Sequence, residues 1–561
     1  MYYNIIMHIS QGDATLQTHL LGPHPILAHF LEQLDLASII SSHVGTGRER
    51  LLTHGEALCS LVHNILDSPA PLYRIASWAE PFAPQSLSLT PEQKQALNDD
   101  RIARMLDALV SERGRGIWFD LAVKMIRQFK VATQRMHQDT TTVTFHGGYP
   151  GSVREPRITH GHNKDHRPDL KQLVFGLTVS ADGAVPLHHQ VHSGNKTDDR
   201  IHRGNLEQLR QILGKSDFIY VADGKVATHA NMMEIQQHGG KFVTVLPRTR
   251  TEDKEFRQQL RRHPARWKKF HSIPNKRDSS APPDQFYTCS YSKLTQEGFR
   301  LIWVRSSAKA WQDEAGRIRI LDQTLAELSA LNQRLNRRQL RSRAKIQQAI
   351  AKILNPSGVQ PFIQLKLQKQ VYKEFKRLRP GRPAANAPVR VLRKALWSLK
   401  AQPDKKALAI EKRADGVFPM ASNLTTATSK KDILQIYKYQ PYVEKRFSQI
   451  KTDLEIAPVY LKKSLRCAGL LHAYFVALAV ASLIERSVRQ EMLRQNIKSL
   501  PLFPEDRNTS TPTCARILEA FRGVQWHEFR RGEETVCFPL KLSALQKLLL
   551  QLLKVPQELY R

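Results

Sequence analysis

Three carboxylates stand where metal-dependent phosphoryl chemistry could be built: Asp139, Asp223 and Glu444. Asp139 directly precedes the β-rich run 140–145, and Asp223 directly follows the short apolar run 218–222. Open α/β sheets place their sites at the carboxyl ends of strands. Carboxylate oxygens are the ligands that Mg²⁺ and Mn²⁺ prefer, and three converging carboxylates can hold two ions about 4 Å apart. One ion then activates an attacking oxygen and the other stabilises a leaving oxygen.

Glu444 lies in a stretch with helical periodicity. At about 100° per residue, four polar side chains fall within a wedge of roughly 60°: Tyr437, Gln440, Glu444 and Lys451. An apolar stripe lies about a quarter-turn away: Ile436, Val443, Phe447, Ile450 and Leu454. The stripe can pack on a core while Glu444 and Lys451 point from the adjoining face. Pro441 either kinks this helix or starts a new one after Gln440.

The charge of the chain indicates a polyanionic partner. Its 561 residues include 85 Lys or Arg and 51 Asp or Glu, a formal net charge of +34. Between Leu331 and Arg413 there are 22 Lys or Arg and only three acidic residues, which favours phosphate contact over a merely solvated face. The five cysteines are scattered without CxxC spacing, which argues against zinc ribbons and disulfide frameworks and fits a reducing compartment.

Other candidate ligands have structural explanations. The remaining acidic residues near the motifs fit loop, helix-cap and turn positions: Asp165, Asp169, Asp198 and Asp415. Four histidines in strand-like runs could suggest a metal site, but no cysteine lies near them: His137, His188, His189 and His192. Trp303 could stack on an extruded base, and packing in the core explains it more simply. The apolar stretch 467–484 is expected to be a buried core helix rather than a membrane span, and the N-terminus lacks the features of a signal peptide.

The expected elements divide the chain into five regions. In chain order these are a helical N-terminal domain (1–125), the first part of a mixed α/β core (130–250), an inserted basic subdomain (251–413), the second part of the core with the helix of Glu444 (414–495), and a helical C-terminal segment (500–561). The first part of the core should hold three strands in meander, then helix, strand, helix and strand. The N-terminal helices suit DNA binding, and a packing domain of another purpose fits them equally.

Local signals set several boundaries. Residues 26–44 have the apolar spacing of one helix. Thr53 to Glu56 forms a capping-box pattern, and Thr90 followed by Pro91 predicts another helix start. In the inserted region we expect a β-pair and then mostly helix, including a solvated helix over 332–353.

Several spaced motifs in this chain match one known group of enzymes. The signature Tyr-x2-Arg-x3-Glu-x6-Lys appears as Tyr437, Gln440, Glu444 and Lys451, with Gln440 in place of the usual Arg. Four further blocks match a closer branch: 161–170, 194–198, 415–418 and 458–462. On these motifs the chain resembles the DDE transposases, and among them the bacterial insertion-sequence-four group. The resemblance covers about residues 20 to 550 and implies a ribonuclease-H-like catalytic core, as in retroviral integrases, with a large insertion before Glu444.

The resemblance implies a two-metal mechanism with two Mg²⁺ or Mn²⁺ ions. Asp139 and Asp223 would ligate the ions, with Asp139 bridging both and Glu444 completing the site. Activated water would nick the end of the element, and the freed 3′-OH would then attack in excision and insertion. Six residues would contact the DNA: Tyr437 and Lys451 at the terminal phosphates, Gln440 at the position of the usual Arg, and Lys164, Arg167 and Lys171 as secondary contacts.

The resemblance also implies the partners of the chain. These are double-stranded DNA, namely the terminal inverted repeats and the target, and a second copy in a synaptic homodimer, with no membrane. The expected location is the cytoplasm of a bacterium, at the nucleoid. Two alternatives stay open: a DNA-binding protein whose catalytic site has decayed, and a metal-dependent nuclease on the same fold that cuts without joining.

Overall fold

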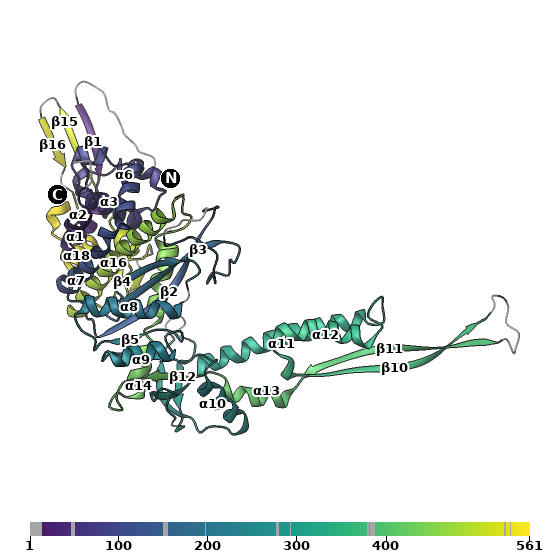
Figure 1. Cartoon of the computed structure of the whole chain (residues 1–561). Helices are drawn as coiled ribbons and strands as arrows, with labels where there is room; N and C mark the ends of the chain where they lie inside the picture. The colour runs from purple at the N-terminus through teal and green to yellow at the C-terminus, as the bar shows by residue number, and fades with distance from the viewer. Residues whose placement is uncertain are drawn as a thin grey trace. The chain divides into compact units, whose positions relative to one another are not determined.

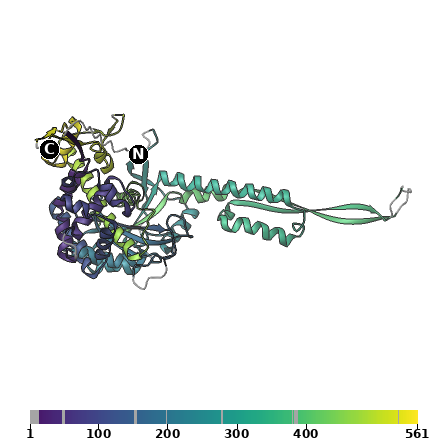
Figure 2. The ribbon, with the colours of Figure 1, turned by 90° about the horizontal axis from the view of Figure 1, so that it is seen from above.

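The computed structural model describes residues 14–46, 51–149, 155–196, 198–275, 280–291, 293–378, 381, 388–505, 507–531, 534–538 and 540–560. It shows a mixed α/β chain that divides into two compact units (Figures 1 and 2). The first unit consists of Met1–Thr244, Asn423–Thr428 and Asp432–Arg561, and the second of Val245–Ser422 and Ser429–Lys431. The predicted basic insertion, 251–413, therefore falls within the second unit, and all three candidate carboxylates fall within the first.

The first unit begins with one strand and a group of short helices. In chain order these are β1 (Ala14–Leu20), α1 (His24–Gln33), α2 (Leu36–Val44), α3 (His54–Asp67), α4 (Ile75–Ala79), α5 (Pro91–Gln95), α6 (Asp99–Leu109) and α7 (Ile117–Phe129). Both predicted caps are confirmed, since Thr53 and Thr90 each form a capping box. The expected single helix over 26–44 is wrong. Asp35 adopts a left-handed conformation with φ of 53° and separates α1 from α2.

The sheet of the first unit is built around β2. Its members are β2 (Arg135–Phe145), β3 (Lys171–Ser180), β4 (Pro186–Ser193), β5 (Ile219–Val221) and β6 (Lys241–Val245), with α8 (Asp198–Leu213) and α9 (His229–Gln237) between the later strands. The spatial order is β4-β3-β2-β5-β6. The meander β2-β3-β4 is antiparallel, whereas β5 pairs parallel with both β2 and β6. This succession of strands and helices is the one that the sequence predicted.

The C-terminal part of the first unit supplies the remaining core. It comprises α14 (Lys430–Tyr437), α15 (Pro441–Ser448), a π-helical turn (Gln449–Asp453), α16 (Ser464–Arg494), β13 (Leu500–Pro501), β14 (Asn508–Thr509), α17 (Cys514–Glu519), β15 (Gln525–Arg531), β16 (Glu534–Phe538) and α18 (Ala544–Leu553). The C-terminal segment is thus not purely helical, because β15 pairs with β16 and also with β1. Strand β1 likewise adds a strand to the N-terminal region, which was expected to be helical.

Helix α16 is the central core helix of this unit. It contains the apolar stretch 467–484 and packs on α3, α6, α18 and β4 (Figure 1). Among the described residues it is the one helix long and apolar enough to cross a membrane, and 94% of its most apolar window is buried inside the protein. A helix that is apolar on all sides is expected where protein surrounds it.

The second unit combines a small antiparallel sheet with a long helical and β-ribbon extension. Its elements are α10 (Thr251–Arg262), β7 (Lys268–Ile273), β8 (Asp284–Thr288), β9 (Arg300–Ser306), α11 (Ser307–Arg334), α12 (Arg343–Ser357), β10 (Ile363–Arg377), β11 (Val389–Pro403), α13 (Lys405–Glu411) and β12 (Val417–Ser422). The predicted β-pair is confirmed in β8 and β9, and Trp303 of β9 is buried and stacks on Phe256. Trp303 therefore cannot stack on an extruded base in this structure.

The expectation of a mostly helical inserted region is wrong over 363–403. Strands β10 and β11 pair in register along their full length, from Ile363 opposite Pro403 to Arg377 opposite Val389. The aliphatic residues and Phe375 of β10 all lie at odd-numbered positions and therefore on one face of the strand: Ile363, Leu365, Leu367, Val371 and Phe375. The predicted helix over 332–353 is also interrupted, because α11 ends at Arg334 and α12 begins at Arg343.

Arg446 fixes helix α15 to the body of the first unit. Its guanidinium group donates to the backbone oxygens of Gly183 and Ala184 at 2.8 and 3.0 Å, to the side chain of Gln449 at 2.7 Å, and to Glu485 of α16 at 2.9 Å. The side chains of Arg446 and Glu485 are only 7% and 5% exposed. A buried ion pair whose remaining donors are all satisfied holds its two elements at a defined separation.

We expect Arg446→Leu to lower the free energy of unfolding by about 3 kcal/mol, because the buried carboxylate of Glu485 loses its nearer cation and keeps the more distant Arg489, at 3.4 Å. Lys445→Leu is the matched control, since Lys445 is the exposed neighbour on the same helix and should change stability by less than about 0.5 kcal/mol. Urea unfolding of both variants measures the difference. Equal effects of the two substitutions would mean that the buried pair does not hold α15.

Candidate active site

The parallel pairing of β2 with β5 brings Asp139 and Asp223 together. Arg135 is opposite Ile219, and His137 is opposite Val221. Continuing this register by two residues sets Asp139 opposite Asp223, just where β5 has ended. Neighbouring strands lie about 4.8 Å apart, and paired residues of parallel strands point to the same face of the sheet. The register therefore brings the two carboxylates close together, with Asp223 two residues beyond the last paired residue of β5.

The environment of Asp139 opposes its ionisation. Burial raises the pKa of its carboxyl group to about 6, and the charge of Asp223 acts in the same direction. The ammonium group of Lys164, 3.5 Å from Oδ1 of Asp139, and the backbone N–H of Thr140, which donates to the same oxygen at 2.7 Å, both work against this rise. The raised pKa of Asp139 is therefore mainly an effect of burial, to which Asp223 adds and which Lys164 and Thr140 offset only in part.

Tyr437, at the end of α14, senses all three candidate carboxylates. Its pKa is raised to about 12, first by burial and then by the negative charges of Asp223, Glu444 and Asp139. One phenol group is therefore within electrostatic reach of acids that are up to 305 positions apart along the chain. The structure thus gathers the carboxylates from β2, from the end of β5 and from α15 around one side chain.

Helix α15 starts at Pro441 and is fastened to β2 by Gln440. The open question about Pro441 is settled in favour of a new helix, because α14 ends at Tyr437 and Pro441 occupies the first helical position of α15. The amide nitrogen of Gln440 donates to the backbone oxygen of Gln138 at 2.8 Å, and its amide oxygen lies 3.1 Å from Nδ1 of His137. Because that oxygen only accepts, Nδ1 of His137 carries the proton.

This fastening brings Glu444 to the side of the sheet on which Asp139 lies. His137 and Asp139 are two residues apart on β2, so their side chains point to the same face. Gln440 meets His137 on this face, and the ring of Tyr439 lies 5.0 Å from the ring of His137. Glu444 follows one turn after Gln440 and is exposed. Gln440 itself is 7% exposed with both amide ends bonded inside the protein, so in this structure it joins α15 to β2 and presents no free group to DNA.

The loop before β3 carries two lysine contacts toward the site. Lys164 donates to the side-chain and backbone oxygens of Thr140, at 2.9 and 2.5 Å, in addition to its contact with Asp139. Its neighbour Asp165 accepts two hydrogen bonds from the ammonium group of Lys451, at 2.8 and 2.9 Å. The loop thereby connects β2 with the π-helical turn after α15.

Arg167 and Lys171 make local contacts instead. Arg167 forms a two-pronged ion pair with Asp169, both of them exposed, and Lys171 donates to the backbone oxygen of Gly148. Arg167 and Lys171 lie outside the region that connects the other seven predicted site residues. These seven are Asp139, Asp223, Glu444, Tyr437, Gln440, Lys164 and Lys451.

The donor set fits a divalent cation by its chemistry. Asp139 and Asp223 supply hard oxygen ligands, and their mutual repulsion is what a bound cation would relieve. Among the residues that the structure describes, no three His, Cys, Asp or Glu side chains form a ready-made metal cluster. Glu444, exposed on its helix, is the least constrained of the three carboxylates.

Sequence reasoning missed three residues that shape the site: His137, Asp165 and Arg446. The sequence provided no reason to make His137 a metal ligand, and its pairing with Gln440 was not predicted. His137 lies in an expected strand, and Gln440 belongs to the spaced signature of the Glu444 helix. Asp165 was interpreted as a loop residue and is the partner of Lys451. Arg446 is buried on a helix face where a charged residue is costly unless paired. Its partner, Glu485, lies in the largely apolar helix α16. An acidic residue within an apolar helix and a basic residue on the apolar face of another helix could have indicated a buried ion pair.

The comparisons with known proteins are limited. A family model described as a domain of unknown function, DUF4277, matches residues 16–123. No curated protein matches the chain. Among solved structures, the chain is similar to one described as a cryo-EM structure of the piggyBac transposase synaptic complex with hairpin DNA. The TM-score is 0.36 and the identity 10%, over 83% of this chain and 77% of the other. So weak a likeness leaves function to be argued from the site itself.

We expect Gln440→Ala to lower the free energy of unfolding by about 1–3 kcal/mol, because it strands the buried oxygen of Gln138 and Nδ1 of His137. Gln435→Ala, at an exposed position of α14, is the matched control and should cost less than about 0.5 kcal/mol. Gln440→Glu should be as damaging as the alanine variant at neutral pH, because a carboxylate cannot donate to Gln138. A silent Gln440→Glu substitution would contradict the assigned hydrogen bonds.

Asp139→Asn should be more stable than the wild type above pH 6. The pKa of Asp139 is raised in the folded state, so the stability contributed by its neutral form is present below its ordinary pKa of 3.8 and is lost as the pH rises through about 6. Removing the charge should gain on the order of 2 kcal/mol at pH 8 and nothing near pH 3.5. Thermal unfolding across this pH range measures the gain. Asp169→Asn, which removes an exposed carboxylate whose pKa is lowered by Arg167, should show no such gain.

Proposed function

We propose that this protein is a DDE-type transposase that cleaves DNA at the ends of an insertion sequence and transfers the cut strands into target DNA. The observation that carries the proposal is the convergence of Asp139 on β2, Asp223 two residues after β5, and Glu444 on α15 around Tyr437. Neighbouring carboxylates that cannot both ionise easily lower the stability of the folded protein. Such pairs are expected where a protein binds a divalent cation together with a phosphate group.

The catalytic core is proposed to be ribonuclease-H-like. The succession of three antiparallel strands, helix, strand, helix and strand, with the first acid on the first strand and the second after the fourth, supports this assignment. The large segment between β6 and α14 corresponds to the insertion of the insertion-sequence-four group. Its signature residues Tyr437, Glu444 and Lys451 lie on consecutive elements, α14, α15 and the π-helical turn.

Each residue of the site has a proposed task. Asp139, Asp223 and Glu444 would hold the cations. Two Mg²⁺ or Mn²⁺ ions would supply activation of the attacking oxygen and neutralisation of the leaving oxygen. Lys451 and the hydroxyl of Tyr437 orient the terminal phosphate. Lys164 would supply positive charge beside Asp139 in the absence of the cations. Phosphoryl transfer gains most of its rate from the positioning of the reacting groups and from the stabilisation of charge.

The proposed partners are the terminal inverted repeats of the element, the target duplex and a second copy of the chain in the synaptic complex, inside a bacterial cell. A decayed DNA-binding protein would have no reason to keep a buried acid next to a second one. A nuclease on the same fold would cut and would not join. The formation of joined products separates these functions.

We expect Asp139→Asn, Asp223→Asn and Glu444→Gln each to reduce Mg²⁺-dependent cleavage of an end-containing duplex by at least about 10³-fold, because each removes one charged ligand. DNA binding in gel-shift experiments should remain within about threefold of the wild type. Asp169→Asn is the control and should cleave normally. Mg²⁺ should also raise the melting temperature of the wild type at pH 8 and leave that of Asp139→Asn unchanged.

Normal cleavage by Glu444→Gln would remove Glu444 from the site. Cleavage without joined products, measured on labelled target DNA, would favour the nuclease. Absence of both cleavage and Mg²⁺-dependent stabilisation in the wild type would favour the decayed protein.

A further inference from the structure

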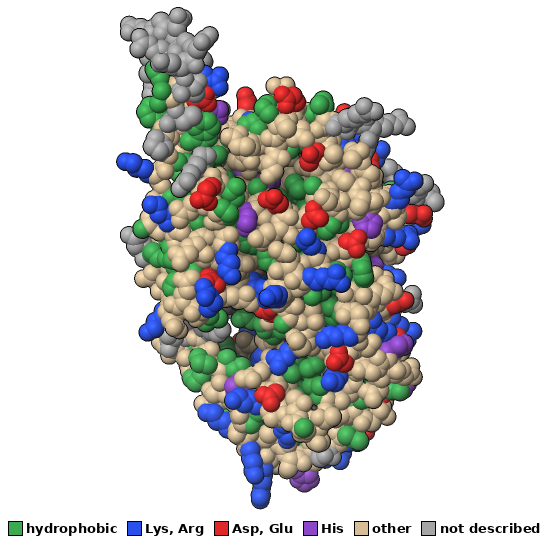
Figure 3. Space-filling model, turned by 90° about the vertical axis from the view of Figure 1, so that its left-hand side faces the viewer, with side chains coloured by type: hydrophobic (Ala, Val, Ile, Leu, Met, Phe, Trp, Pro, Cys, Tyr) green, Lys and Arg blue, Asp and Glu red, His purple; other side chains and the backbone are tan. Residues whose placement is uncertain are grey.

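The second unit carries a two-stranded ribbon with a large uncompensated charge. The basic arm, as we name residues 363–403, consists of β10 and β11 and the segment that joins them. It contains 11 Lys or Arg and one acidic residue, Glu374, which is itself paired with Lys394. Figure 3 shows one face of the structure, on which Lys and Arg side chains are interspersed with acidic ones. The arm has no such compensation.

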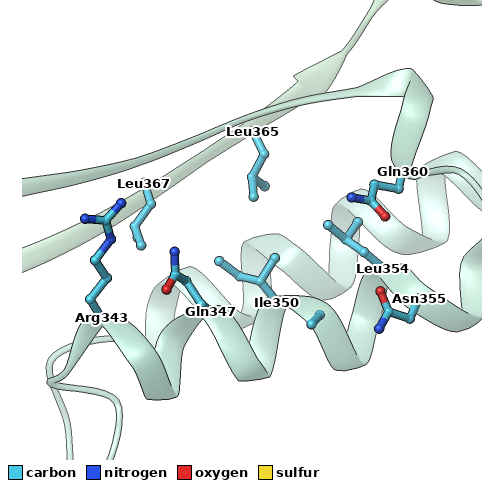
Figure 4. Close-up of a pocket in the computed structure, with 9 residues that line it drawn as sticks. Arg343, Gln347, Ile350, Leu354, Asn355, Gln360, Leu365 and Leu367 are labelled. Carbon is cyan, nitrogen blue, oxygen red and sulfur yellow. The ribbon is translucent and has the colours of Figure 1, made fainter.

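The base of the arm is anchored by helices of its own unit. Leu399 of β11 belongs to an apolar core with α11 and α12, and Leu367 and Trp397 pack against that core. Figure 4 shows Leu365 and Leu367 pointing from β10 toward Ile350 and Leu354 of α12. The ribbon therefore starts from a fixed platform.

Side chains of α11 and of the turn that follows it also bind the edge of β11. Asn332 accepts from the backbone N–H of Leu399 at 2.7 Å, and Asn336 exchanges two hydrogen bonds with the backbone of Trp397, at 2.7 and 2.9 Å. These contacts fix the register of the base, because they bind the backbone of two particular residues of β11.

Beyond Trp397 the ribbon continues past the end of α12 (Figures 1 and 2). Val371 and Phe375, which follow on the face that packs at the base, are 58% and 63% exposed. A two-stranded ribbon is marginally stable in water on its own, so an extension of this length is expected to bind a partner. The residues from Lys369 to Arg377 span roughly 30 Å at about 3.3 Å per residue, close to one turn of duplex DNA.

The opposite face of the arm is mainly polar, with Tyr372, Leu392 and Leu396 interspersed and Glu374 as its acidic residue. The strand register sets Lys366 opposite Lys400, Gln368 opposite Ser398 and Lys376 opposite Arg390, so these side chains share one face. Four basic side chains of this face are exposed, and Gln370 is exposed as well; the four are Lys366, Lys376, Arg390 and Lys400. Lys and Arg contact phosphates and guanine edges, glutamine reads adenine, and the major groove is wide enough for a two-stranded ribbon.

We propose that the basic arm lies in the major groove of a DNA duplex, with the face formed by Lys366, Gln368, Gln370, Lys376, Arg390 and Lys400 turned to the DNA. Charge selects this occupant, since two copies of a ribbon with this charge repel each other and a polyanion does not. The inference rests on the proposed function only in taking DNA as the partner, and it requires no catalysis.

The test uses the full-length chain and a 40-base-pair duplex in buffer without divalent metal. The arm variant replaces Lys366, Lys376, Arg390 and Lys400 by Gln. The control variant removes the same charge from exposed lysines of the first unit by Lys241→Gln, Lys498→Gln, Lys541→Gln and Lys547→Gln. In the arm variant the slope of log affinity against log salt should fall by about 3–4, at about 0.9 for each phosphate that is no longer neutralised, and the affinity near 0.15 M salt should fall at least tenfold. The control should lose less than a third of that slope.

Methylation protection identifies the groove. Wild-type protein should protect guanine N7, which lies in the major groove, and the arm variant should lose this protection. Protection of adenine N3 alone would overturn the groove assignment. Equal losses of affinity in the arm and control variants would overturn the arm as the docking surface.

A second variant guards against misfolding of the first. Joining Lys369 to Trp397 through Asn-Gly removes the distal ribbon and keeps the anchored base, because these two residues are directly opposite each other. It should melt within about 2 °C of the wild type and bind DNA as weakly as the arm variant. If it binds DNA normally and instead loses self-association in sedimentation, the arm pairs with a second copy and the proposal is wrong. A wild type that binds DNA through the arm without cutting it would leave this inference standing while the proposed function fails.

Discussion

The burial of Asp139 on β2, next to the carboxylate of Asp223 just after β5, is the constraint on which the candidate site depends. The register of β2 and β5 ends with His137 opposite Val221 and, continued by two residues, brings Asp139 next to Asp223. Burial first, and the charge of Asp223 in addition, make the ionised form of Asp139 costly, and this cost appears as its raised pKa. Lys164 lowers that cost without removing it. The negative charge of the two carboxylates is only partly neutralised by the protein, so the site favours the binding of a cation. This is the physical basis of the proposed chemistry.

The third carboxylate is delivered by different means. Glu444 lies on a short helix whose two fastenings are buried: Gln440 to β2 at its start, and Arg446 to Glu485 in its second turn. Pro441 removes one backbone donor at the point where the chain must turn from α14 into α15. Rigid attachment of the helix and exposure of its carboxylate are compatible, because the buried contacts lie on either side of Glu444 along the sequence.

The elements of the first unit were predictable from the sequence to the extent that their signals are local. Caps at Thr53 and Thr90, the order of strands and the acids at strand positions all depend on neighbouring residues. The role of Gln440 could not be predicted, because its partner His137 is 303 positions away and hydrogen-bonding capacity does not identify a partner. The break at Asp35 was missed for a related reason, since a residue in the left-handed conformation leaves the apolar spacing on both sides intact.

The basic arm was missed although its alternation was present in the sequence. Its charge dominated the interpretation, and Lys and Gln are common on solvated helices. Leu365 and Leu367, then Val371 and Phe375, nevertheless keep a period of two that only a strand can use. The charge of the arm and that of the site also act over different ranges. Salt screens the field of the arm beyond about 8–10 Å, so its charge acts mainly on a duplex that it contacts. Asp139 and Asp165 are instead balanced at contact distance by Lys164 and Lys451 of their own unit.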